Sequence, residues 1–251
     1  MEHLLSLKDV TYNYHTLKDE TQAIKSITMF ADDKEFVSIV GPSGCGKTTL
    51  LSLIAGILSP SGGTITLGGE PLASKKNKIG YMFQRDHLFE WRTVLQNVKL
   101  GLEINKDKSP ESLAYVNELL KKYGLQDFKG KYPAHLSGGM RQRVALIRTL
   151  AMRPEILLLD EPFGALDYQT KRIVIQDVSN IIANEQKTSI LVTHDLNEAV
   201  SLSDRIVVLS KRPSEVKKVF VSNLRSIPSI DDRKNTDEYK DLVDKIWKEL
   251  I

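Results

Sequence analysis

The chain has 251 residues, of which 41% are hydrophobic and 27% charged, and these proportions are those of a globular protein with a full hydrophobic core. Its 35 basic and 32 acidic side chains leave a formal net charge of +3, which is too small to indicate nucleic acid or an anionic membrane as a partner. The single cysteine, Cys45, excludes an internal disulfide bond and a cysteine-based metal cluster, and it is typical of a reducing compartment.

Neither a membrane-spanning helix nor a signal peptide is visible. The longest apolar candidate, residues 50–58, is interrupted by Ser52 and Gly56, whereas a span needs about 18 apolar residues in a row. The first residues lack the basic segment and apolar core of a signal peptide. We therefore expect the chain to be cytosolic, and any membrane process that it serves would need other chains to cross the bilayer.

The first part of the chain alternates apolar and polar residues in short runs bounded by glycine, which predicts strands. The expected strands are residues 4–12, 24–31, 36–40, 64–67 and 79–83, with a polar loop over 16–22. The third of these strands runs into a glycine-rich turn, and helix-forming residues follow it from 48 to 58. Strand, glycine loop and helix in this order are typical of a phosphate-binding unit.

Helical spacing then dominates from about residue 93 to residue 152, and we place an inserted helical region at about 86–155. The expected helices are residues 94–102, 113–123 and 144–152. Buried strands return at 156–160, 188–193 and 205–209 with helical stretches between them, which predicts βαβ units and a parallel sheet in an α/β fold.

The end of the chain, residues 221–251, is a polar extension that closes with an amphipathic helix over 237–250. Its apolar face is made of Tyr239, Leu242, Val243, Ile246, Trp247 and Leu250. We expect this helix to fold back on the body of the protein through Trp247, and docking of a partner is the alternative.

The glycine-rich turn has the full spacing of a phosphate loop, Gly, four residues, then Gly-Lys-Thr. Its glycines let backbone N–H groups surround phosphate oxygens, Lys47 adds a charge to the β and γ phosphates, and the Thr48 hydroxyl can ligate Mg²⁺. The residues expected to hold the phosphates of ATP are Gly41, Pro42, Ser43, Gly44, Cys45, Gly46, Lys47, Thr48 and Thr49.

An acid pair, Asp160 and Glu161, ends the strand 156–160, and open α/β sheets bind their ligands at the carboxyl ends of strands. We expect Asp160 to bind Mg²⁺ through water and Glu161 to polarise the attacking water, because phosphoryl transfer needs an aligned nucleophile and neutralised phosphate charge.

A second glycine-bearing segment, Leu-Ser-Gly-Gly-Met-Arg-Gln-Arg over 136–143, opens a helix and is a second candidate anion site. On its own, the segment is better explained as an ordinary helix start capped by Ser137. The amino-acid sequence of this segment, however, resembles the signature motif of ABC-type ATPases, and roughly residues 1–215 are similar to that family. Gln84 matches the family's Q-loop, residues 165–167 its D-loop, and His194 its switch histidine.

The resemblance implies a P-loop ATPase core with an antiparallel β subdomain and the inserted helical subdomain, together spanning residues 1–220. It also implies that two copies enclose two ATP molecules, each held by one chain's phosphate loop and by Ser137, Gly138 and Gly139 of the other chain. Asp167 of the D-loop is also expected among the ATP-binding residues.

The resemblance also implies roles for residues whose function could not be decided from their chemistry alone. It implies that Gln84 senses Mg²⁺ and the γ-phosphate, and that His194 contacts the γ-phosphate and holds the attacking water. Tyr14 stands where the family has an aromatic that stacks on adenine, and Tyr12, two residues earlier, could take that role.

Cys45 lies beside Lys47 at a helix N-terminus, where a thiol pKa tends to fall. We consider two interpretations: a reactive thiol whose modification blocks ATP hydrolysis, and a small residue that the loop tolerates.

The segment 86–98 is rich in apolar and aromatic residues directly after the Q-loop, where the family docks a helix of its membrane subunit. Phe89 and Trp91 are expected either at that docking surface or within the helical region. Three features are most similar to ATPases that import nitrate, sulfonates, taurine and thiamine precursors. They are the amino-acid sequence of residues 91–98, the signature segment and the short tail after Pro213. Phe89 and Glu90 depart from them, because those relatives commonly have leucine and proline before the tryptophan.

We therefore expect an ATP-hydrolysing subunit of an ABC importer on the cytoplasmic face of the cell membrane, with ATP and Mg²⁺ as cofactors. Its expected partners are a second copy, transmembrane permease subunits and, indirectly, an extracytoplasmic solute-binding protein for a small anionic or heterocyclic solute. Nucleic acid is not an expected partner. The alternatives are an ABC ATPase that acts on nucleic acid or ribosomes, and an exporter subunit.

Overall fold

The computed structural model describes residues 3–15, 20–164 and 166–251, and within them one ten-stranded sheet forms the body of the protein. Its strands are β1 (Leu5–His15), β2 (Glu20–Ala31), β3 (Phe36–Val40), β4 (Gly62–Leu67), β5 (Glu70–Pro71), β6 (Ile79–Met82), β7 (Ile156–Asp160), β8 (Thr188–Val192), β9 (Arg205–Leu209) and β10 (Ser214–Val221). The helices are α1 (Lys47–Ile54), α2 (Val94–Val98), α3 (Leu100–Ile104), α4 (Pro110–Lys122), α5 (Gly138–Leu150), α6 (Tyr168–Asn184), α7 (Leu196–Leu202), α8 (Ile230–Lys234) and α9 (Asp237–Leu250).

The sheet has an antiparallel half and a parallel half, in the order β5-β4-β1-β2-β10-β9-β3-β8-β7-β6. Strands β1, β2, β4 and β5 pair antiparallel, whereas β9, β3, β8, β7 and β6 pair parallel. Strand β10 joins the halves, because it runs parallel to β2 and antiparallel to β9. Every residue of β3, β7, β8 and β9 is buried, which explains why these strands read as short runs that are mostly apolar.

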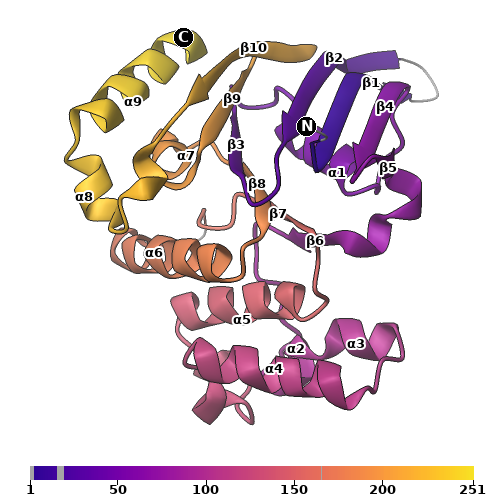
Figure 1. Ribbon diagram of the computed structural model, residues 1–251, viewed down its shortest axis with the longest axis vertical. Coiled ribbons are helices and arrows are strands. Elements are labelled where there is room, and N and C mark those ends of the chain that lie inside the picture. Colours follow the sequence, from indigo (N-terminus) through magenta and orange to yellow (C-terminus); the bar gives the residue numbers. More distant parts are fainter. Residues whose placement is uncertain (1–2, 16–19, 165) are drawn as a thin grey trace.

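Helices α2 to α5 lie between β6 and β7 in the sequence and form a separate layer at the bottom of Figure 1. Helix α5 packs against α6, and the buried side chains of this layer are continuous with the core on one face of the parallel strands. The capping box of Thr93 and Gln96 fixes the start of α2, and Ser137 caps α5 through the backbone N–H of Met140.

Several predicted boundaries move for local reasons. Helix α1 ends at Ile54 rather than at residue 58, because Gly56 adopts the left-handed conformation (φ 67°) that closes a helix. The single helix expected over 94–102 is two short helices that meet at Lys99. Strand β2 begins at Glu20, inside the expected loop 16–22, of which residues 16–19 lie outside the described part of the chain.

The C-terminal helix α9 folds back on the body, where it packs against α7, β9 and β10. Tyr239, Leu242 and Ile246 are buried in this contact, but Trp247 is 56% exposed, so the expectation that the helix docks through Trp247 is wrong. The buried residues are spaced three and four apart and form one stripe, and Trp247 lies about 100° around the helix from Ile246. None of the helices in the described residues is long and apolar enough to span a membrane.

We expect Ile246→Ala to lower the free energy of unfolding by about 2–4 kcal/mol, because it leaves a cavity beneath α9. The change Trp247→Ala should cost less than about 1 kcal/mol, because more than half of that side chain is in solvent. Urea unfolding of both variants measures the difference. Equal losses, or a larger loss for Trp247→Ala, would contradict the packing described for α9.

Candidate functional site

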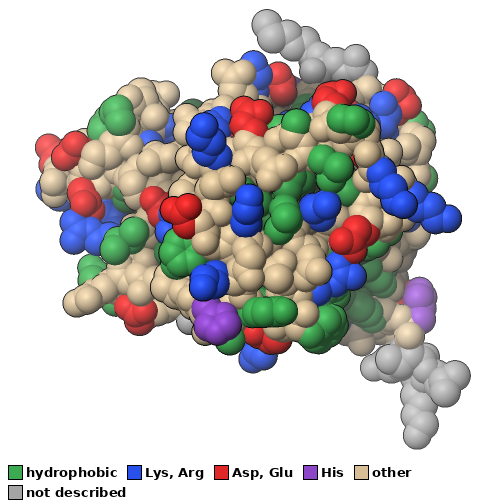
Figure 2. All heavy atoms as spheres, turned by 90° about the horizontal axis from the view of Figure 1, so that it is seen from below, with side chains coloured by type: hydrophobic (Ala, Val, Ile, Leu, Met, Phe, Trp, Pro, Cys, Tyr) green, Lys and Arg blue, Asp and Glu red, His purple; other side chains and the backbone are tan. Residues whose placement is uncertain are grey.

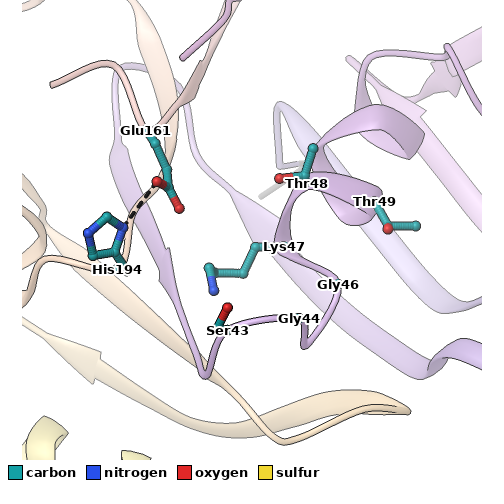
Figure 3. Close-up of a pocket in the computed structure, with 8 residues that line it drawn as sticks. All are labelled: Ser43, Gly44, Gly46, Lys47, Thr48, Thr49, Glu161 and His194. Atoms are coloured by element: carbon teal, nitrogen blue, oxygen red, sulfur yellow. Dashed lines mark hydrogen bonds and ion pairs between the residues drawn. The ribbon is translucent and has the colours of Figure 1, made fainter. Parts of the chain in front are cut away.

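An open pocket with a volume of about 630 Å³ lies at the carboxyl edge of the parallel strands. Its lining residues come from the loop after β3, the start of α1, the turn after β7 and the turn after β8, and Figure 3 shows Lys47, Glu161 and His194 from these elements on the same side. The lining residues are Ser43, Gly44, Gly46, Lys47, Thr48, Thr49, Glu161 and His194. Neighbouring parallel strands end at the same edge of a sheet, which brings together residues that are more than 100 positions apart in the sequence.

The loop after β3 holds a buried cation. Lys47 is 7% exposed, and its Nζ donates to the backbone carbonyls of Gly41 at 2.8 Å and Pro42 at 3.0 Å. Gly46, the residue before α1, has φ 109°, a left-handed conformation that a residue with a Cβ rarely adopts. The turn therefore leads directly into α1, whose positive N-terminal end faces the pocket together with the ammonium group.

Cys45 is buried in this loop rather than lining the pocket. Burial raises the pKa of its thiol, and the nearby Lys47 ammonium, 3.9 Å from Sγ, only partly opposes this effect. The lowered pKa on which the reactive-thiol interpretation depends is therefore not found, because desolvation of the thiolate outweighs the attraction of the cation. The reactive-thiol interpretation loses its physical basis.

The turn after β7 presents two carboxylates in different surroundings. Asp160 is 8% exposed and accepts hydrogen bonds from the Tyr81 hydroxyl at 3.0 Å and from Thr48 Oγ1 at 3.4 Å. Burial raises the pKa of Asp160, and the charge of neighbouring Glu161 acts in the same direction. Tyr81 on β6 is a site residue that the motifs do not contain, and it reaches Asp160 because β6 pairs with β7.

Glu161 and His194 meet across the mouth of the pocket. His194 Nδ1 lies 3.0 Å from Glu161 Oε2, which is the dashed contact in Figure 3. Glu161 has φ 44°, and its N–H donates to the carbonyl of Val192 at the end of β8. A non-glycine residue in the left-handed region is uncommon, and such residues gather at functional sites.

Tyr14 and Tyr12 differ in exposure. Tyr14 is 39% exposed and shares a hydrogen bond of 2.9 Å with Thr49 Oγ1. Tyr12 packs against the core, and the two rings meet edge to face with centroids 4.9 Å apart. Tyr14 therefore lies at the surface beside the loop, whereas Tyr12 supports it from below.

Two further expected residues lie outside the lining of the pocket. Gln84 follows β6 and is exposed, with its side chain directed toward the backbone of Gly164 after the acid pair. Asp167 caps α6 by accepting from the N–H groups of Gln169 and Thr170, and the hydrogen bonds with Thr170 and Gln169 lower its pKa. Residue 165 of the expected D-loop lies outside the described residues.

The signature segment is also away from the pocket of its own chain. Ser137, Gly138 and Gly139 begin α5 in the lower layer of Figure 1, whereas α1 lies beside the sheet above. None of these three residues lines the pocket. One chain therefore presents two separate glycine-bearing helix starts.

Comparison with known proteins identifies the family. Residues 24–164 match the model of the ABC transporter family. The chain is 45% identical to YtlC, an uncharacterized ABC transporter ATP-binding protein of Bacillus subtilis strain 168, covering 98% of this chain and 95% of YtlC. It is 41% identical to the nitrate import ATP-binding protein NrtD of Synechocystis, covering 88% and 83% of the two chains. It is 39% identical to the aliphatic sulfonates import ATP-binding protein SsuB of Bacillus thuringiensis, covering 88% and 86%.

Two solved structures have the same fold. The dimeric cassette MJ0796, in a post-hydrolysis state bound to ADP and Pi, superposes with a TM-score of 0.72 at 35% identity, covering 86% of this chain and 98% of that one. The protein cbiO1 of Clostridium perfringens, part of an ABC transporter complex, superposes with a TM-score of 0.79 at 27% identity, covering 98% and 100%. The fold class predicted from the sequence is confirmed, and the chain belongs to the ABC transporter family as one of its ATP-binding, ATP-hydrolysing subunits.

Proposed function

We propose that this chain powers an ABC importer, hydrolysing ATP as a homodimer attached to membrane permease subunits. The observation that carries the proposal is the pocket itself, in which the Lys47 ammonium, the start of α1 and the contact between Glu161 and His194 surround one hollow. Relatives named for nitrate and sulfonate import support the direction of transport and a small anionic solute. A heterocyclic solute is the second chemical class that we propose.

The residues of the pocket divide the work of phosphoryl transfer. Lys47 and the N–H groups of the loop bind the β and γ phosphates, and Tyr14 stacks on adenine. Glu161 polarises the attacking water. His194 contacts both Glu161 and the γ-phosphate and so keeps the two groups aligned. The contact of 3.0 Å between Glu161 and His194 fits this pairing.

The proposed site for Mg²⁺ is formed by Thr48, Asp160 and, in the closed enzyme, Gln84. Thr48 Oγ1 and Asp160 Oδ1 are 3.4 Å apart, and hydroxyl and carboxylate oxygens are the donors that Mg²⁺ prefers when phosphates complete its shell. A bound Mg²⁺ neutralises charge on the phosphates. The buried Tyr81 hydroxyl orients the Asp160 carboxylate by donating to its Oδ2.

We propose that a second copy completes each ATP site with Ser137, Gly138 and Gly139. The pocket of one chain is open and is not lined by these residues, although they begin a helix that could face an anion. The related cassette that is bound to ADP and Pi is a dimer, which supports the same assembly here.

The proposed docking surface for the permease includes Phe89 and Trp91. Trp91 is 73% exposed, and its ring stacks on that of Phe89 with centroids 4.9 Å apart. An exposed tryptophan stacked on a half-buried phenylalanine fits a groove of a partner. We also propose that the chain works on the cytoplasmic face of the membrane, with a solute-binding protein as an indirect partner on the other side.

Nucleic acid or a ribosome is not favoured as the partner. Figure 2 shows basic and acidic side chains interspersed over the lower face of the molecule, without a field of one sign.

The proposed organisation is an ATPase domain over residues 1–220, containing the helical subdomain at about 86–155, and an extension over 221–251.

We expect Lys47→Ala to weaken ATP binding at least about tenfold, because it removes the cation from a partly buried anion site. Isothermal titration with ATP measures the affinity. The exposed Lys245, changed to Ala, serves as the control. An unchanged affinity in Lys47→Ala would remove the proposed role of the loop.

The change Glu161→Gln should leave ATP binding intact and abolish turnover, so that an ATP-bound dimer accumulates. Size-exclusion chromatography with light scattering at saturating ATP measures the mass, and Glu118→Gln on the exposed face of α4 is the matched control. A Glu161→Gln protein that stays monomeric under these conditions would refute the proposed assembly.

Uptake assays test the direction of transport. In cells whose own copy is replaced by Glu161→Gln, accumulation of a labelled substrate from a panel of nitrate, sulfonates, taurine and thiamine precursors should fall to background. Faster accumulation in the variant would point to an exporter, and unchanged handling of the whole panel would contradict the proposed solute class.

A further inference from the structure

His194 has little direct support from packing. Its side chain is 68% exposed, and its recorded contact is the one with Glu161 Oε2. The backbone sets where the Cα–Cβ bond of His194 lies and which rotamers its side chain can adopt, so the position of the ring depends on the peptide segment of Thr193, His194 and Asp195.

That segment is held from both sides by side chains. Thr193 is 1% exposed, and its hydroxyl donates to Glu198 Oε2 at 2.5 Å and accepts from the N–H of Asp195 at 3.0 Å. Asp195 caps α7 by accepting from the N–H of Asn197 at 2.8 Å. Thr193 and Asp195, the neighbours of His194, are thus held to the first turn of α7. A carboxylate makes the contact in both cases, because Glu198 accepts from Thr193 and Asp195 accepts from Asn197.

The two carboxylates share one lysine from another helix. Lys171 Nζ, on α6, lies 2.7 Å from Asp195 Oδ2 and 2.6 Å from Glu198 Oε1. The Glu198 side chain is only 3% exposed, and its burial raises its pKa. Partial burial by itself would lower the pKa of Lys171, but its hydrogen bonds to Asp195 and Glu198 raise it above its usual value. The ammonium therefore stays charged between the two acids.

We propose that Lys171 is a positioning residue for His194, acting through Asp195 and Glu198 to fix the peptide that carries the imidazole. This inference rests on the proposed role of His194 in hydrolysis. Lys171 lies one turn after Asp167, whose carbonyl accepts from the Lys171 N–H at 2.8 Å. The same side chain therefore links the start of α6 to the turn after β8, so that a shift of either reaches the other.

Removal of the cation would leave an arrangement that cannot persist. Among the residues that the structure describes, Lys171 is the cation recorded against Glu198 and Asp195. Without it, a buried carboxylate would lose its partner and face a like charge, which favours protonation or outward rotation of Glu198. Outward rotation of Glu198 would remove the acceptor of Thr193, and a displacement of about 1 Å in a group aligned for reaction can reduce the rate by as much as about 100-fold.

The experiment compares Lys171→Met, Lys171→Arg and the neighbouring control Arg172→Met in the full chain. Arg172 pairs with Asp231 on the exposed side of α6, and its hydrogen bonds within the described part of the chain go to that carboxylate. We expect Lys171→Met to lower kcat of ATP hydrolysis by about tenfold or more with KM for ATP unchanged. Lys171→Arg should recover most of kcat, and Arg172→Met should match the unmodified protein.

The position of His194 is read separately by NMR of the imidazole carbons without nucleotide, with the signal assigned through His194→Ala. Lys171→Met should shift the His194 signal and leave those of the other four histidines in place. An unmoved His194 signal, or a parallel fall in ATP affinity and kcat, would overturn the positioning role. If His194→Ala itself keeps full kcat while Lys171→Met still shifts the signal, the proposed catalytic role of His194 fails and the coupling between Lys171 and His194 stands.

Discussion

The parallel alignment of β3, β8 and β7 is the constraint on which the site depends. These strands lie side by side in the sheet and end at one edge, where the next residues of each are the phosphate loop, the switch histidine and the acid pair. Their full burial fixes the register, because a shift by one residue would move every side chain to the opposite face. The positions of Lys47, His194 and Glu161 relative to one another follow from that register.

The charged groups of the site differ in their burial and in their hydrogen-bond partners. The buried Lys47 ammonium donates hydrogen bonds to two backbone carbonyls. A phosphate that enters the pocket can take the place of these carbonyls, because a charged acceptor binds the ammonium more strongly than a neutral one. Asp160 is buried and hydrogen-bonded to Tyr81, whereas Glu161 reaches toward His194. A similar pairing occurs at Lys171, whose ammonium lies beside the buried carboxyl group of Glu198. Through Asp195 and Glu198, Lys171 connects α6 to the start of α7 and to the turn after β8.

The sequence was sufficient to predict what motifs and buried runs encode. The phosphate loop, the acid pair and the parallel strands depend on local spacing, and each is visible in a short stretch of residues. Tyr81 and Lys171 could not be predicted, because their roles arise from the pairing of β6 with β7 and from the packing of α6 beside α7. The reactive-thiol interpretation of Cys45 and the expectation for Trp247 failed for a related reason, since both rested on neighbours in the chain, whereas burial decided the outcome.

The central claim is that the pocket of one chain is half of an ATP site and that Ser137 to Gly139 of a second copy provide the other half. The most direct measurement combines Lys47→Ala in one chain with Ser137→Arg in another, both in the Glu161→Gln background, and determines mass and bound nucleotide at saturating ATP. Each variant alone should stay monomeric. The mixture should form a heterodimer with one ATP, because one site of that dimer has an intact loop and an intact signature segment. A mixture that stays monomeric, or a single variant that dimerises by itself, would contradict the account.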